Sequence, residues 1–181
     1  MKKINVLLFA LFSSLAIATQ AQTFNKGDKV LNIGIGLGSV YGLSGFGSSV
    51  PPLSASFEVG ITDKVGIGRF GVGGIFGYSS YKYNSGFTTS NFTSSHILIG
   101  ARGLYHFDLD VEKLDLYGGI MLGYNIVSYS DSFGTSNLFT GSGVVGGIFG
   151  GARYMFSEKI GAFGELGYSI AWLNLGLTVK F

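Results

Sequence analysis

The chain has 181 residues, of which 46% are hydrophobic and only 12% are charged, and it has no cysteine. Soluble domains carry about 25% charged residues, so this composition is not typical of a fully solvated surface. The absence of cysteine excludes disulfides and thiolate metal sites.

The first 21 residues have the organisation of a secretory signal peptide. Lys2 and Lys3 precede an apolar run from Val6 to Ile17, which is shorter than the ~20 residues of a spanning helix, and cleavage is expected after Ala21. We therefore expect a signal peptide over 1–21 and a single domain over 22–181. Without the two lysines, the twelve basic residues fall to ten against ten acidic ones, so the charge does not indicate a nucleic-acid partner.

The remaining sequence alternates between large apolar residues and small or polar ones, which is the pattern of β-strands. In "LNIGIGLG", from Leu31 to Gly38, glycine or asparagine follows every aliphatic residue. Eight strands are expected, over 29–39, 53–62, 65–79, 95–108, 114–128, 142–156, 159–170 and 172–181. In the third, the alternation changes near Arg69, which is explained either by a bulge at Gly68 or by Arg69 extending into water at a membrane rim.

The connections between these strands alternate in length. Those at 40–52, 80–94 and 129–141 are long and polar, whereas those at 62–64, 109–113 and 157–159 are short and charged. This arrangement is typical of an all-β, eight-stranded antiparallel up-and-down transmembrane barrel, in which aliphatic residues face lipid. The interior of such a barrel is narrow, so inward glycines would leave room for larger inward side chains.

The inward positions of the expected strands also carry charge, and we expect a polar plug in the half of the barrel near the short turns. A buried charge needs a partner, and a contact between Arg153 and Glu165 across their hairpin is expected. The plug would act as a structural filling, or as a gate or narrow conduit. Its expected members are Glu58, Arg102, His106, Arg153, Glu165 and Lys180.

Sequence motifs for catalysis or metal binding are weak. Two glycine-rich matches at 66–71 and 141–146 lack the strand–turn–helix context of a dinucleotide site. The acidic stretch at 108–112 lacks the glycine of a calcium loop. His96 lies beside Ser94 and Ser95, as in a lipid hydrolase, but no acid is placed to orient it. We therefore expect a protein that is not an enzyme, with no catalytic residue, metal or cofactor.

The C-terminal stretch "NLGLTVKF" resembles the assembly signal of outer-membrane barrels, and its matching residues are Asn174, Gly176, Val179 and Phe181. With the signal peptide and eight strands, the chain resembles the small outer-membrane β-barrel families: the OmpA-like transmembrane domain, the OmpX and OmpW types, and the PorT-like "outer membrane protein beta-barrel domain". It is expected to lack the peptidoglycan-binding domain of OmpA-type wall anchors.

This resemblance implies a Gram-negative outer membrane, with lipid and lipopolysaccharide around the barrel. It also implies insertion by the barrel assembly machinery, both termini in the periplasm and long loops outside. The expected role is structural or surface-interacting, with at most narrow passage and an extracellular partner that the sequence does not identify. Two alternatives stay open: an OmpW-like transporter of small hydrophobic molecules, for which Leu98, Leu104, Phe149 and Phe163 would line the interior, and a soluble lipocalin-like barrel.

Overall fold

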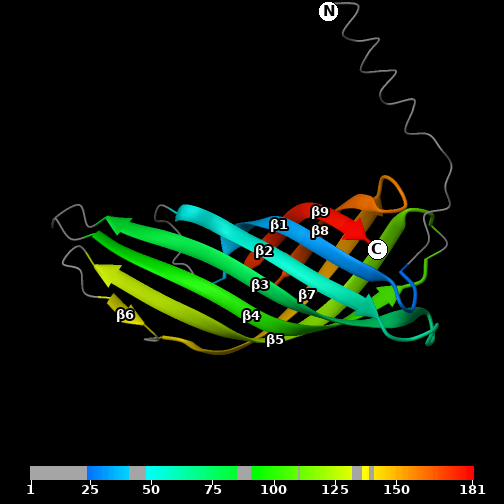
Figure 1. Cartoon of the computed structure of the whole chain (residues 1–181), viewed down its shortest axis with the longest axis horizontal. Coiled ribbons are helices and arrows are strands. Elements are labelled where there is room, and N and C mark those ends of the chain that lie inside the picture. Colours follow the sequence, from blue (N-terminus) through cyan, green and yellow to red (C-terminus); the bar gives the residue numbers. More distant parts are fainter. Residues whose placement is uncertain (1–23, 41–47, 85–90, 110, 132–135, 139–140) are drawn as a thin grey trace, which may run out of the picture.

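The protein forms a closed antiparallel β-barrel in a computed structural model that describes residues 24–40, 48–84, 91–109, 111–131, 136–138 and 141–181 (Figure 1). The expected signal peptide lies outside these ranges, as do parts of the expected long loops. The strands are β1 (Lys29–Ser39), β2 (Ser48–Gly60), β3 (Gly68–Asn84), β4 (Asn91–Phe107), β5 (Leu114–Asp131), β6 (Ser136–Leu138), β7 (Gly143–Met155), β8 (Ile160–Gly167) and β9 (Ala171–Lys180). In the described part of the chain, no helix is long and apolar enough to span a membrane.

Pairing of neighbouring strands closes the barrel. The order runs β4-β3-β2-β1-β9-β8-β7-β5, and β4 also pairs with β5. β1 pairs with both β2 and β9, which joins the two ends of the chain. The short strand β6 is added to β5 beyond the point where β7 begins. The expected eight-stranded antiparallel barrel is therefore confirmed, and β6 is an addition that the sequence did not indicate.

Strands β2 to β5 extend farther on the long-loop side than predicted, so parts of the expected loops are strand. β3 and β4 stay paired from Gly68↔Phe107 to Asn84↔Asn91, although 80–94 was expected to be a loop. The backbone of polar residues forms the hydrogen bonds between strands as well as that of apolar residues does. Because few residues there are apolar, however, the sequence shows no alternation of hydrophobicity that would predict a strand. On the left of Figure 1, β3, β4 and β5 extend well past β1, β8 and β9.

The irregularity around Arg69 arises from a turn. Val65 and Gly68 exchange backbone hydrogen bonds, and Gly66 adopts φ 65°, a conformation that glycine allows without strain. β3 begins only at Gly68, so the residues before it do not belong to the strand alternation. The Arg69 Nη1 atom lies 3.3 Å from Asp108 Oδ1 at the short-turn end, which agrees with a position at the rim rather than with a bulge.

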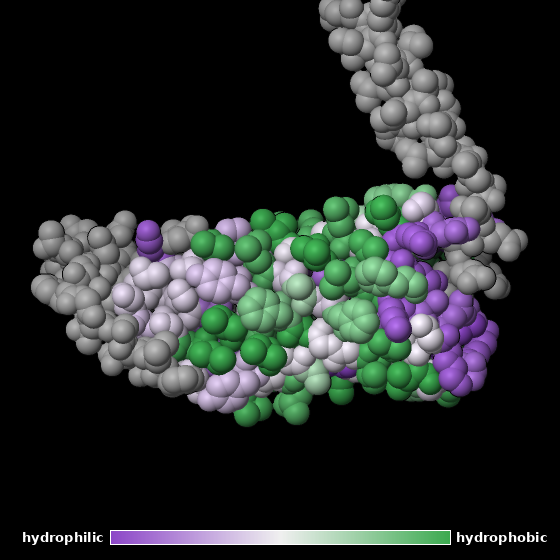
Figure 2. All heavy atoms as spheres, viewed as in Figure 1, coloured by the Kyte–Doolittle hydropathy of each residue, from purple (hydrophilic) through white to green (hydrophobic). Residues whose placement is uncertain are grey.

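Most of the large aliphatic and aromatic residues of the strands point outward. Ile33, Ile120 and Leu177 expose 60%, 66% and 60% of their surface, while Asn32, Glu58 and Arg153 are buried inside. Figure 2 shows an apolar band across the middle of the barrel and strongly polar residues at the short-turn end. This orientation is the reverse of what a soluble lipocalin-like barrel requires, because such a barrel needs its apolar side chains inside.

Inward glycines make room for inward aromatic rings, as the alternation predicts. A Cβ atom on Gly34 would lie 2.8 Å from Phe163 Cζ, and one on Gly176 would lie 2.7 Å from Cε1 of the same ring. A Cβ atom on Gly119 would lie 2.5 Å from Phe149 Cζ. At these positions of the interior, aromatic rings therefore pack directly against bare backbone.

We expect Gly34→Val to destabilise the barrel by about 1–3 kcal/mol, because overpacking forces the Phe163 ring or the backbone to move. Gly150→Val is the matched control, since its Cβ atom would have no neighbour closer than 3.9 Å. Equilibrium unfolding by urea in detergent micelles measures both. Equal midpoints for the two variants would show that the interior is not tightly packed at Gly34.

Candidate functional site

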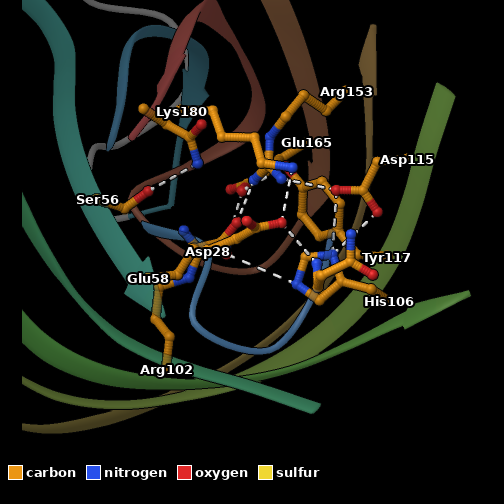
Figure 3. A network of polar contacts seen from close by, with 12 residues as sticks. Asp28, Ser56, Glu58, Arg102, His106, Asp115, Tyr117, Arg153, Glu165 and Lys180 are labelled. Atoms are coloured by element: carbon orange, nitrogen blue, oxygen red, sulfur yellow. Dashed lines mark hydrogen bonds and ion pairs between the residues drawn. The ribbon is translucent and has the colours of Figure 1, made fainter. Parts of the chain in front are cut away.

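The most distinctive site is a cluster of charged side chains inside the short-turn half of the barrel (Figure 3). Arg153 on β7 lies at its centre: Nη1 donates to Asp115 Oδ2 at 2.6 Å, and Nη2 donates to Glu58 Oε1. Asp115 on β5 also contacts His106 Nδ1, at 2.9 Å. Since Arg153 is only 2% exposed, its charge is compensated by these two carboxylates rather than by water.

A second ion pair lies beside the first. Arg102 Nη2 donates to Glu165 Oε1 at 2.7 Å, and the Tyr117 hydroxyl donates to the same oxygen at 2.9 Å. The Arg102 guanidinium also lies 3.9 Å from the centre of the Phe149 ring. The aromatic ring and the carboxylate thus hold this cation from two sides.

The segment before β1 covers the cluster from the short-turn end. Phe24 is buried and stacks on His106, with ring centres 3.8 Å apart. Asp28 pairs with Lys180 at 2.6 Å, which joins this segment to the end of β9. A void of about 10 Å³ remains between Phe24, Asp115 and Arg153, which is at the lower limit for one water molecule.

The structure brings all six expected residues to the short-turn half, with partners that differ in part from those expected. Arg153 contacts Glu58 and Asp115, whereas Glu165 contacts Arg102 and Tyr117, so the expected hairpin contact between Arg153 and Glu165 is replaced. Sequence reasoning omitted Asp115 from the charged set, although its position on β5 faces inward. Phe24 precedes the first strand, so no alternation indicated its role.

Apolar side chains also pack in the barrel interior, beside the charged cluster and above it toward the long-loop side. Leu98, Leu104 and Phe149 are buried here, and they belong to one packed cluster with Ile75 and Ile170. Phe163 is buried as well, against Gly34 and Gly176. The four residues expected to line a hydrophobic passage are therefore packed side chains.

His96 lies in a polar group nearer the long-loop end. Its Nε2 atom lies 3.1 Å from Ser94 Oγ, and its Nδ1 atom lies 3.2 Å from Asn125 Nδ2. A serine hydrolase places a carboxylate at Nδ1, where its charge stabilises the imidazolium that forms during catalysis. Asn125 is a neutral amide, so it can orient the ring but does not supply that charge.

The four residues of the expected assembly signal lie on the last strand and at its end. Asn174 is buried and donates to Ser54 Oγ at 3.0 Å, and Gly176 lies against Phe163. Val179 pairs with both Leu31 and Ile160 in the sheet, and Phe181 is 67% exposed. Asn174, Gly176 and Val179 therefore belong to the strand that closes the barrel between β1 and β8, and the backbone N–H of Phe181 donates to Lys29 O beyond its end.

We expect Arg153→Met to destabilise the barrel by about 3–5 kcal/mol, because it leaves Glu58 and Asp115 buried without their cation. The control is Arg69→Met, whose ion pair at the rim should contribute about 0–1 kcal/mol. Urea unfolding in micelles measures both, and adding Glu58→Gln to Arg153→Met should recover part of the loss. Equal small effects for the two single variants would contradict a strongly coupled cluster.

Comparison with solved structures supports the barrel architecture. Ail, the attachment invasion locus protein of Yersinia pestis, solved in complex with the heparin analogue sucrose octasulfate, aligns with a TM-score of 0.54 and 16% identity over 86% of this chain and 99% of its own. The N-terminal β-barrel domain of OprF from Pseudomonas aeruginosa aligns with a TM-score of 0.55 and 16% identity over 87% of this chain and 98% of its own. At this level of identity, the similarity establishes the fold alone.

No curated protein matches the sequence. A family model matches, however, and it covers residues 7–179, which is nearly the whole chain. With the closed barrel, the apolar outer band and the polar interior, this match confirms the expected resemblance. The chain belongs to the outer membrane protein beta-barrel domain family.

Proposed function

We propose that this protein is a non-enzymatic barrel of the outer membrane with a structural and surface-contact role, and with at most very narrow passage through its interior. The observation that carries the proposal is the packing of side chains across the interior in the described part of the barrel. The charged cluster and Phe24 occupy the short-turn half, and the apolar cluster around Leu98 and Phe149 occupies the middle. An eight-stranded barrel is just wide enough for side chains to fill it.

The protruding sheet supports the surface-contact part of the proposal. The paired ends of β3, β4 and β5 carry Ser, Thr, Tyr and Asn and lie beyond the apolar band, with β6 added at the edge. Polar strand ends of this kind suit contact with water and with another surface. In this proposal, the long-loop side faces the exterior and the short turns and both termini face the periplasm.

The proposal includes the expected processing and assembly steps. Residues 1–21 would be removed on export, and the C-terminal residues Asn174, Gly176, Val179 and Phe181 would present the barrel to the assembly machinery. Support for the latter comes from the exposed Phe181 ring at the end of β9, where another protein can reach it.

The filled interior predicts that the purified protein produces no discrete conductance steps in a planar lipid bilayer. A larger barrel from the same preparation method serves as the positive control. If the wild-type protein does produce conductance steps, and the steps are larger in Arg153→Met, the charged cluster would instead be a conduit.

The proposed orientation is tested by labelling single cysteines, which the chain allows because it has none of its own. Lys82→Cys on the protruding part of β3 should react with a membrane-impermeant maleimide on intact cells. Glu158→Cys, in the turn between β7 and β8, should react only after the outer membrane is permeabilised. Both side chains are exposed, so the reverse labelling pattern would invert the orientation.

A further inference from the structure

The outer face of the barrel carries a groove of about 460 Å³ near the short-turn end, across β3, β4 and β5. This volume lies in the range of small-molecule sites, and the exposed lining is almost wholly apolar. The side chains that face it come from the outward positions of the three strands and from the turn that follows β2. They include Ile61, Thr62, Phe70, Val72, Tyr105 and Ile120.

Two outward glycines form the floor of the groove. Gly103 pairs with Val72 on one side and Ile120 on the other, and Gly118 pairs with Tyr105. Because the glycines have no side chain, their backbone is exposed between the larger neighbours. Because larger side chains stand on either side of this exposed backbone, hydrocarbon must enter the groove to make contact with it.

An excess of positive charge lies next to the groove at the short-turn rim. Lys64, two residues after Thr62, has its Nζ atom 2.8 Å from Asp108 Oδ2, and Arg69 pairs with the other oxygen of the same carboxylate. The hydrogen bond from Lys64 lowers the pKa of Asp108, so this carboxyl stays ionised at neutral pH. Two cations therefore contact Asp108, while the neighbouring Asp63 has Lys26 as its own partner at 2.9 Å. The Lys64 side chain is 56% exposed to further partners.

We propose that this groove binds one membrane glycerophospholipid, with an acyl chain along the glycine floor and the headgroup phosphate against Lys64. Binding of a lipid in the groove does not depend on the proposed orientation of the barrel. Only the assignment of that lipid to the periplasmic leaflet rests on the proposed function. The apolar lining matches the chain, and the surplus charge at the rim matches the phosphate.

A second copy of the chain fits the groove less well. A two-fold contact places the same surface patch of both subunits together, which would bring the two positively charged rims close to each other. In addition, the groove is concave, so in a two-fold contact the groove of one copy would face the groove of the other and neither would be filled. A flexible acyl chain carries no positive charge and can follow the concave surface.

Native mass spectrometry of the full-length barrel, released from detergent micelles containing phosphatidylglycerol, tests the site. The wild-type protein should retain one phosphatidylglycerol. Gly103→Leu should reduce this occupancy at least tenfold, because its side chain fills the groove. The new Cβ atom lies 3.9 Å from its nearest neighbour, so the barrel can accommodate it. Lys64→Gln should reduce the occupancy severalfold.

Gly146→Leu is the matched control, since Gly146 is an outward glycine on β7 outside the groove, with 3.9 Å to the nearest atom from its Cβ position. It should retain lipid as the wild type does. Slower gel migration after heating checks that each variant is folded. The lipid assay uses the isolated folded barrel, so its result is independent of the cysteine labelling and conductance experiments.

Three outcomes would overturn the proposal. The wild type could retain no phosphatidylglycerol, or Gly103→Leu could retain as much as Gly146→Leu. Alternatively, the species lost in Gly103→Leu could be a protein dimer or an adduct with lipid A, which would assign the groove to a second copy or to lipopolysaccharide.

Discussion

The narrow interior of an eight-stranded barrel is the constraint on which the rest of this structure depends. Every second residue of each strand points into a space that is only wide enough for side chains. A ring such as Phe163 fits only where its neighbours across the sheet are Gly34 and Gly176. The glycines at these inward positions are therefore a packing requirement and not a sign of loose structure.

The same constraint determines how charge is held inside. A buried ion pair contributes little net stability, but removal of one partner is costly. Here Arg153 and Arg102 are held by carboxylates from three different strands, β2, β5 and β8. The pairs Arg153–Glu58 (β7 to β2) and Arg102–Glu165 (β4 to β8) join strands that are not neighbours in the sheet and so fix the cross-section of the barrel. The aromatic rings of Phe24, Tyr117 and Phe149 exclude water around them.

Sequence alternation alone predicted the eight strands, their direction and which residues face inward. It succeeded because lipid and a filled interior impose opposite demands on successive residues, which leaves a strong period of two. It failed where that contrast disappears, as in the ends of β3 and β4 near the long loops, where polar residues occupy both alternating positions. Contacts across the lumen, such as Arg153 with Glu58, depend on strand tilt and side-chain length, which no local pattern records.

Closure of the sheet has a consequence for how the chain reaches its native state. Val30 near the start of the chain pairs with Lys180 near its end, so the final seam joins almost the whole length of the sequence. Contacts of such long sequence separation are slow to form, because the loop entropy is lost before any contact compensates it. No part of the cylinder can be completed while the last strand is missing. Closure of the β1–β9 seam is therefore a late step in folding, since it needs the last strand of the chain.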